Sequence, residues 1–327
     1  MLIKSKDEVG NTIKQISEFQ NGNILPLKTG IEHLDMHLLG GLTPSIKVGI
    51  CAMSGFGKTH FLEDLLTGLS KHNDMSDVVF LQCNWEIPQF KQILRDLSRS
   101  TGKSVKDVLF SPPSKEDITI YSEVTAKYKA DNLYIQKRPS TPLEFYNDAM
   151  ELVEKYKESK IIISIDNLEN VLVESGNQQA EMVKVLSYIN QISMAHSHVS
   201  FLILNQMNRS LAQRTEPMQQ FPQEQDIFGT GAFFKLCDVI LGIHMPFKLG
   251  LKEYGVFSTN RYKYIDDSFK KKGTGKNSKF KAGGNIFYHY LKSRDIALEY
   301  DIQDLFVEKI FDVPEDKEEE KITEFDY

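Results

Sequence analysis

Several features of membrane and secreted proteins are missing from this sequence of 327 residues. It has no run of about 18 consecutive apolar residues, which a membrane-spanning helix needs, and residues 1–7 lack the apolar core of a secretory signal. Its three cysteines, Cys51, Cys83 and Cys237, lie in apolar runs without a CxxC spacing, so neither a disulfide framework nor a zinc site is indicated. We therefore expect a cytoplasmic protein with buried thiols and no membrane contact.

The chain also lacks the positive net charge that favours binding to nucleic acids. Its net charge of −6 comes wholly from residues 312–327, where eight acidic residues and two lysines predict a disordered acidic tail. Residues 261–281, by contrast, are basic and contain Lys270, Lys271 and Lys272 in a row. This segment is either an ordinary solvated loop or a loop that contacts DNA.

Short apolar runs alternate with helical patterns along most of the chain. The predicted strands are residues 46–52, 78–83, 133–136, 160–166, 199–205 and 239–244. The predicted helices include residues 60–69, 142–156 and 179–194. Apolar strands joined through helices indicate an α/β fold, in which a mostly parallel twisted sheet is covered on both faces. Alternating residues 286–291, followed by 302–310, predict antiparallel edge strands near the C-terminus.

Residues 5–20 predict a separate amphipathic helix. Val9, Ile13, Ile16 and Phe19 recur at helical spacing with polar residues between them. The apolar stripe of such a helix needs a cover, and either the chain's own domain or a neighbouring subunit can supply it.

The segment Ala52-Met53-Ser54-Gly55-Phe56-Gly57-Lys58-Thr59, between the first strand and its helix, predicts a phosphate-binding loop. Gly55 and Gly57 can adopt backbone angles that point successive N–H groups, including those of Ser54 and Phe56, toward a phosphate. Lys58 would then meet the β- and γ-phosphates of ATP, and the Thr59 hydroxyl would ligate Mg²⁺. Ala52 replaces the usual first glycine. The alternative is a helix start with an ordinary exposed lysine.

Two carboxylates follow strands of the same predicted sheet. Asp166 ends the apolar strand 160–166, as does the residue that holds Mg²⁺ in NTPases with a phosphate loop. Glu86 follows the strand 78–83 and is placed to polarise an attacking water. Alternatively, Glu86 lies in the first turn of a helix and only complements the helix dipole, since Pro88 can stand near a helix start.

Three further residues suit roles around a triphosphate. Gln206 directly follows the strand 199–205, where an amide can sense the γ-phosphate. Lys292 and Arg294, two residues apart, can meet the charge that develops during phosphoryl transfer, often in a neighbouring subunit. The alternative for these two is an unremarkable pair of surface cations.

Taken in order, these motifs resemble the RecA-like motor domain of DnaB-family replicative helicases over residues 5–311. The resemblance rests on seven segments, which are residues 29–35 with 40–42, 52–59, 85–88, 133–135 with 141–142, 165–169, 205–211 and 292–294. It implies a RecA-like core and a hexameric ring that hydrolyses ATP with Mg²⁺ between subunits. Such a ring moves 5′ to 3′ along single-stranded DNA.

The resemblance also assigns roles to the residues named above. Lys58 and Thr59 would bind phosphates and Mg²⁺, Asp166 would hold the metal shell, and Glu86 would be the catalytic base. Gln206 would sense the γ-phosphate, while Lys292 and Arg294 would reach the nucleotide of the adjacent subunit. DNA-facing loops are expected at about residues 172–180 and 209–231, the second with Arg209 and Arg214 as cations.

The implied organisation is a linker-type helix in residues 1–28, an ATPase domain in 29–311 and the acidic tail, which can recruit a replication partner. We expect no counterpart of the family's N-terminal collar, where primase docks, and so a chain more like a phage or mobile-element helicase. We expect it in the nucleoid or in a phage replication complex. Two alternatives stay open, namely a RecA-like recombinase or mediator that forms filaments on DNA, and an ATP-binding replication adaptor without hydrolysis.

Overall fold

The structure, a computed structural model, describes residues 5–214, 221–251, 253–257, 278–281, 285–295 and 305–309. The expected acidic tail and most of the basic segment, including Lys270, Lys271 and Lys272, lie outside the described residues. Among the residues described, no helix is both long and apolar enough to span a bilayer. The three cysteines are buried and free, as predicted.

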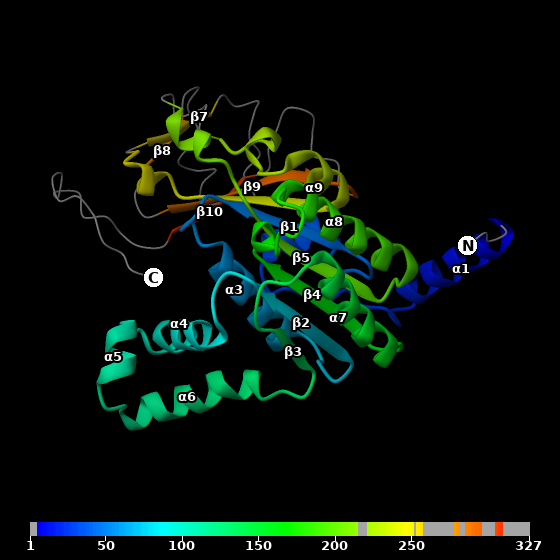
Figure 1. Cartoon of the computed structure of the whole chain (residues 1–327), viewed down its shortest axis with the longest axis horizontal. Helices are drawn as coiled ribbons and strands as arrows, with labels where there is room; N and C mark the ends of the chain where they lie inside the picture. Colours follow the sequence, from blue (N-terminus) through cyan, green and yellow to red (C-terminus); the bar gives the residue numbers. More distant parts are fainter. Residues whose placement is uncertain are drawn as a thin grey trace.

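An eight-stranded sheet forms the centre of the molecule, in the order β10-β9-β6-β1-β5-β4-β2-β3 (Figure 1). The strands are β1 Lys47–Ala52, β2 Val78–Asn84, β3 Leu133–Gln136, β4 Lys160–Asp166, β5 Val199–Gln206, β6 Val239–His244, β9 Asn285–Ser293 and β10 Leu305–Lys309. The six from β6 to β3 are parallel, and β9 and β10 form an antiparallel edge. This arrangement confirms the predicted fold class.

Helices cover both faces of this sheet. In the described residues the helices are α1 Ser5–Gln20, α2 Glu32–His37, α3 Lys58–His72, α4 Gln89–Thr101, α5 Val105–Phe110, α6 Lys115–Tyr128, α7 Pro142–Lys155, α8 Gln178–Ala195 and α9 Thr230–Leu236. Helix α3 carries the chain from β1 toward the β3 edge, whereas α7, α8 and α9 carry it back. Because such crossovers are right-handed, α3 lies on one face and the other three on the opposite face. The contacts of α8 with both α7 and α9 agree with this arrangement.

Local signals in the sequence explain where these helices begin. Helix α7 has a capping box, in which Thr141 accepts from Glu144 N and the Glu144 carboxylate accepts from Thr141 N, and Pro142 takes the first helical position. The apolar faces then meet in one core, where side chains such as Phe145 and Phe201 are fully buried. The carboxyl ends of the parallel strands thereby converge at one edge of the sheet.

Three parts of the fold differ from or add to the expectations. Helices α4, α5 and α6 form an insertion between β2 and β3 that the sequence patterns did not reveal. Residues 278–281, expected in the basic loop, form strand β8 (Ser278–Lys281), which pairs with β7 (Glu253–Phe257). Helix α1 forms as predicted and extends away from the body (Figure 1). Its residues Val9, Ile13 and Ile16 stay 49–62% exposed, so the described part of the chain does not cover the apolar stripe.

Candidate active site

The loop between β1 and α3 has the conformation that its glycines predict. Gly55 and Gly57 have φ angles of +76° and +85°, in the left-handed region that glycine adopts easily. Gly57 is the N-cap of α3 and provides no side-chain cap, so the first N–H groups of the helix face the loop. A β-carbon on Gly57 would lie 3.1 Å from the Met245 methyl group, so glycine also lets the segment after β6 pack over the loop.

Lys58 begins α3 and is held inside this loop. Its Nζ donates to the Ala52 carbonyl oxygen at 3.2 Å, and the residue is only 6% exposed. The alternative of an ordinary exposed lysine is therefore wrong. Burial lowers the pKa of Lys58, and the charges of Glu86, Asp166 and Glu169 oppose that shift. The charges of three carboxylates thus act on one buried ammonium group.

Asp166, the last residue of β4, lies beside Thr59. The residue is 5% exposed, and burial raises the pKa of its carboxyl to about 7, although a hydrogen bond from Thr59 opposes the shift. Within the described part of the chain, the Oδ1 atom of Asp166 has no hydrogen-bond partner. A buried carboxylate oxygen without a donor, next to a threonine hydroxyl, fits Mg²⁺, which proteins bind through one or two such oxygen ligands.

Glu86 follows the end of β2, next to Asp166. Asn84, the last residue of β2, is level with Asp166, and the backbone N–H groups of Trp85 and Glu86 donate to the Asp166 carbonyl at 2.7 and 3.1 Å. Trp85 is buried and Glu86 is exposed. Helix α4 begins only at Gln89, so the alternative of Glu86 as a first-turn helix residue is wrong.

Gln206 ends β5 directly beside the phosphate loop. It is level with Ala52 in the parallel register. The neighbouring Asn205 donates from Nδ2 to the Phe228 carbonyl at 2.8 Å, and Phe228 N donates to the Gln206 carbonyl at 2.9 Å. These bonds fix the strand end at which a γ-phosphate sensor would stand.

Sequence reasoning missed two charged residues at this edge. The Lys248 Nζ, from the 3₁₀ turn η5 (Pro246–Leu249) after β6, donates to the Gly55 carbonyl at 2.7 Å, and burial lowers its pKa. Glu169, in the turn η1 (Leu168–Asn170) after β4, accepts from Asn167 Nδ2 at 2.8 Å, and burial raises its pKa. Both follow the carboxyl end of a parallel strand, and that position is the signal that could have found them.

Lys292 and Arg294 lie at the amino ends of the parallel strands, whereas the phosphate loop lies at their carboxyl ends. Strand β9 is antiparallel to β6, so its end is level with Val239, at the start of β6. The Arg294 guanidinium pairs with Asp238 at 2.7 Å and donates to the Lys235 carbonyl at 2.9 Å. Lys292 Nζ donates to the Phe234 carbonyl at 2.5 Å. The chain therefore does not bring either cation to its own loop.

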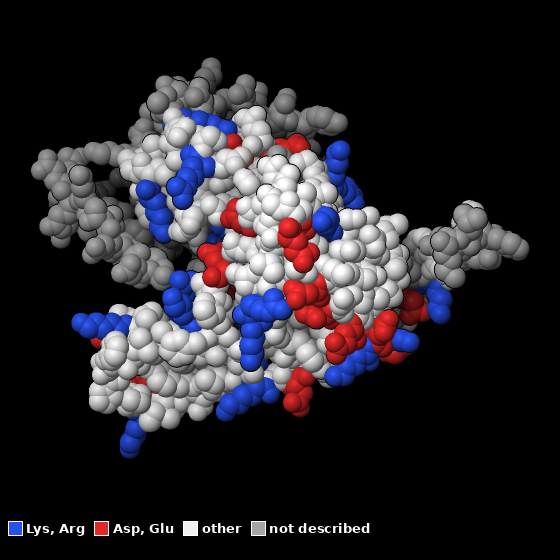
Figure 2. Space-filling view, viewed as in Figure 1, with Lys and Arg blue, Asp and Glu red and all other residues white. Residues whose placement is uncertain are grey.

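The expected DNA-binding residues are only partly described. Arg209 is exposed at the start of the turn η2 (Arg209–Gln213). Arg214 is mostly buried, and its guanidinium pairs with Asp226, which is 1% exposed. On the face in Figure 2, basic side chains stand in separate groups, and acidic ones gather over the side of α7 and α8. DNA contact by Arg209 and Arg214 stays a prediction.

Two solved structures share this fold. One is the ATPase domain of G40P, with a TM-score of 0.66 and 16% identity, over 92% of this chain and 93% of that one. Another is a DnaB-like replicative helicase studied with its interactions with primase, with a TM-score of 0.64 and 17% identity, over 92% of this chain and 68% of that one. At these identities the likeness shows the fold. No curated protein matches the sequence.

A family match covers residues 26–260, which include the phosphate loop, Glu86, Asp166 and Gln206. This range is well over half of the chain. The chain belongs to the family of DnaB-like helicase C terminal domains.

Proposed function

We propose that this chain is an ATP-driven DNA helicase or translocase of the DnaB type. It hydrolyses ATP between the subunits of a homo-oligomer, expected to be a hexameric ring, and moves 5′ to 3′ on single-stranded DNA. One observation carries this proposal. The carboxyl ends of the parallel strands bring together the loop, Asp166, Glu86 and Gln206. Lys292 and Arg294 lie at the amino ends of these strands. A complete site therefore needs a second copy of the chain.

In the nucleotide-bound state, the backbone N–H groups of residues 54–57 and the Lys58 ammonium group hold the phosphates. Thr59 and Asp166 would hold Mg²⁺, which neutralises charge that develops on the phosphate oxygens when it is bound. The carboxyl of Asp166 must lose its proton to act as such a ligand. The nearby Lys58 favours that ionised form.

Glu86 is our assignment for the residue that orients and deprotonates the attacking water. The Glu86 residue is exposed and its charge acts on Lys58, whereas the Glu169 carboxylate already accepts a hydrogen bond from Asn167. Glu86→Gln should reduce hydrolysis to a small residual rate and leave nucleotide binding intact. Glu169→Gln is the matched control, because it removes a charge from the same site. A complete loss of turnover in Glu169→Gln alone would reverse the two roles.

Single-stranded DNA is the proposed partner of the loops around residues 172–180 and 209–231. Arg209 and Arg214 would contact its phosphates, with Arg214 fixed in place by Asp226. Lys270, Lys271 and Lys272 are proposed to add contacts. Their replacement should reduce the salt dependence of DNA binding by about 0.9 per lost phosphate contact. The acidic tail is proposed to recruit a replication partner, in a nucleoid or phage replication complex.

The oligomeric mass with and without ATP and single-stranded DNA tests the proposal most directly. Closed six-membered particles, with ATP hydrolysis that DNA stimulates, would support it. Helical filaments would favour a RecA-like recombinase or mediator instead. If DNA never stimulates hydrolysis, but deletion of residues 312–327 removes a partner, the chain is an ATP-binding adaptor.

A further inference from the structure

Helices α4, α5 and α6 stand beside the sheet as a unit that is inserted between β2 and β3 (Figure 1). Helix α4 contacts both α5 and α6. Two of the three buried side chains of α4 are polar, Gln92 and Asp96, and in the described part of α6 the buried side chain is Asp117. Gln92 of α4 and Lys127 of α6 both contact Glu63 of α3, so polar contacts help attach this unit to the rest of the fold.

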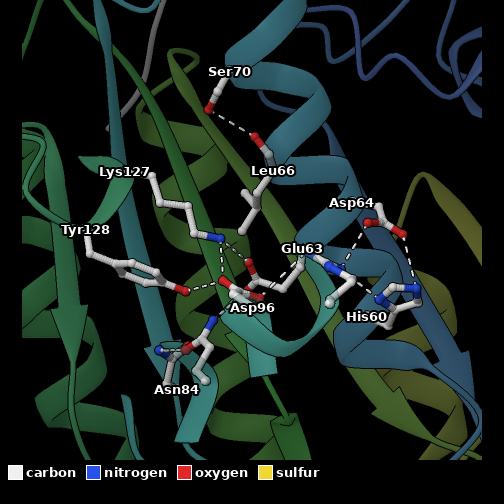
Figure 3. Close-up of polar contacts among 11 residues, drawn as sticks. His60, Glu63, Asp64, Leu66, Ser70, Asn84, Asp96, Lys127 and Tyr128 are labelled. Atoms are coloured by element: carbon white, nitrogen blue, oxygen red, sulfur yellow. Dashed lines mark hydrogen bonds and ion pairs between the residues drawn. The ribbon is translucent and has the colours of Figure 1, made fainter. Parts of the chain in front are cut away.

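Lys127 of α6 lies between two carboxylates from other helices (Figure 3). Its Nζ is 3.2 Å from Glu63 Oε2 of α3 and 2.5 Å from Asp96 Oδ2 of α4. The Tyr128 hydroxyl donates to the same Asp96 oxygen at 2.5 Å. Glu63 and Asp96 are about as buried as core residues, at 5% and 4% exposed. Removing one partner of such a cluster leaves a buried charge, so its geometry is strongly specified.

Gln92 extends this cluster to the end of β2. Its Nε2 donates to Glu63 Oε1, and its Oε1 accepts from Asn84 Nδ2 at 2.6 Å. The partners fix the orientation of the amide, because an ionised carboxylate only accepts hydrogen bonds and must face the Gln92 nitrogen. All three side chains are buried. Each lost bond would therefore leave a polar group without water to replace its partner.

The two ends of this chain of bonds lie on two sides of the candidate active site. Glu63 is about one helical turn after Thr59 on α3. Asn84 is level with Asp166 in the sheet and precedes Glu86 by two residues. Gln92 thus connects the phosphate-loop helix to the turn from which Glu86 projects.

We propose that Gln92 is a positioning residue for ATP hydrolysis. By holding Asn84 to Glu63, it fixes the turn between β2 and α4, and with it the Glu86 carboxylate, relative to the phosphate loop. This role rests on the proposed function, in which Glu86 activates water. A misplacement of about 1 Å can cost a catalytic group on the order of 100-fold in rate. Lys58 and Thr59 keep their own contacts, so nucleotide affinity should not change.

The test compares Gln92→Met with Lys91→Met in the full chain. Methionine keeps the length of Gln92 and removes both hydrogen bonds, whereas Lys91 is exposed on the same helix. We expect kcat of Gln92→Met to fall about tenfold or more at saturating ATP and DNA. The Kd of a fluorescent ADP analogue should stay within about twofold of wild type. Lys91→Met should match wild type in both. Asn84→Ala, which breaks the same chain of bonds at its other end, serves if Gln92→Met does not fold.

A double variant separates positioning from a general loss of stability. If Gln92 acts through Glu86, then Glu86→Gln combined with Gln92→Met should keep the residual turnover of Glu86→Gln alone. A further fall in the double variant, or an unchanged kcat in Gln92→Met, would overturn the proposal. The wild-type chain, measured alongside, shows whether a negative result concerns the proposed function or only the positioning role of Gln92. Absence of any wild-type hydrolysis refutes the proposed function itself, whereas a normal Gln92→Met in an active chain refutes only the positioning role.

Discussion

Replacement of Arg294 by alanine tests whether the active site is shared between subunits. Arg294 lies level with the start of β6, and the phosphate loop begins after the end of β1. About five residues of strand separate the two levels, or roughly 16 Å at about 3.3 Å per residue. An arginine side chain cannot extend that far. Arg294 can therefore act on a triphosphate only if that triphosphate is bound by another copy of the chain.

The structure predicts very different effects of Arg294→Ala on stability and on turnover. The Arg294 side chain is 49% exposed, so its ion pair with Asp238 contributes at most about 1 kcal/mol. In this variant Asp238 would still form its ion pair with Lys47, whose Nζ lies 3.1 Å from the carboxylate. The melting temperature should fall by no more than about 3 °C. Turnover should fall about 1,000-fold, as for other arginines that are supplied to a neighbour's phosphates.

Mixing two inactive variants provides the decisive assay. Lys58→Ala subunits have a defective loop and an intact Arg294, and Arg294→Ala subunits have the reverse. In random mixtures of equal parts, about one interface in four combines an intact loop with an intact arginine. ATP turnover should therefore recover to a measurable fraction of wild type. Mixtures of each variant with wild type serve as the control for subunit exchange. If subunits exchange but turnover does not recover, Arg294 does not work across an interface.

Three further predictions test other parts of the structure. Lys248→Gln should raise the Kd for ADP about fivefold in titration calorimetry, because its ammonium group lies on the phosphate loop; an unchanged Kd would exclude a role in binding. In metal-free protein, the raised pKa of Asp166, about 7 against an ordinary 3.8, means that the unfolded chain loses this proton first. Unfolding free energy should therefore fall between about pH 4 and pH 7, by on the order of 4 kcal/mol, and Asp166→Asn should flatten this slope in urea titrations. Gly68→Ala should lower the melting temperature, since a β-carbon there would lie 1.8 Å from the Thr29 carbonyl oxygen, whereas Gly10→Ala, with open space around it, should not.

Much of the sheet could be predicted from the sequence, because its strands are short apolar runs between clear turn signals. The predicted bounds of β3, β4 and β6 coincide with the observed ones. The phosphate loop was equally predictable, since its glycines, Lys58 and Thr59 are close together in the chain and their spacing alone predicts their roles. Asp166 and Gln206 followed from the rule that ligands gather where parallel strands end.

The parts that could not be predicted depend on contacts between distant residues. Helices α5 and α6 were not predicted because α5 has only six residues and α6 buries no apolar side chain. The pairing of Lys127 with Glu63 joins residues 64 positions apart, and no local pattern marks it. For the same reason the sequence gives no sign of the pairing of Arg214 with Asp226.

The division of the site between two edges of one sheet also explains how hydrolysis can depend on assembly. In the proposed function, a single subunit would supply the phosphate loop, the metal ligand Asp166 and the base Glu86. It lacks the cations that would meet the charge developing on the transferred phosphoryl group, a contribution of about 4 kcal/mol for a 1,000-fold effect. Its Arg294 is meanwhile held by Asp238, at the start of the strand that ends beside the loop. Because this arginine is already ordered, its placement against the nucleotide of a neighbouring subunit would cost little conformational entropy. Formation of the interface would therefore activate hydrolysis.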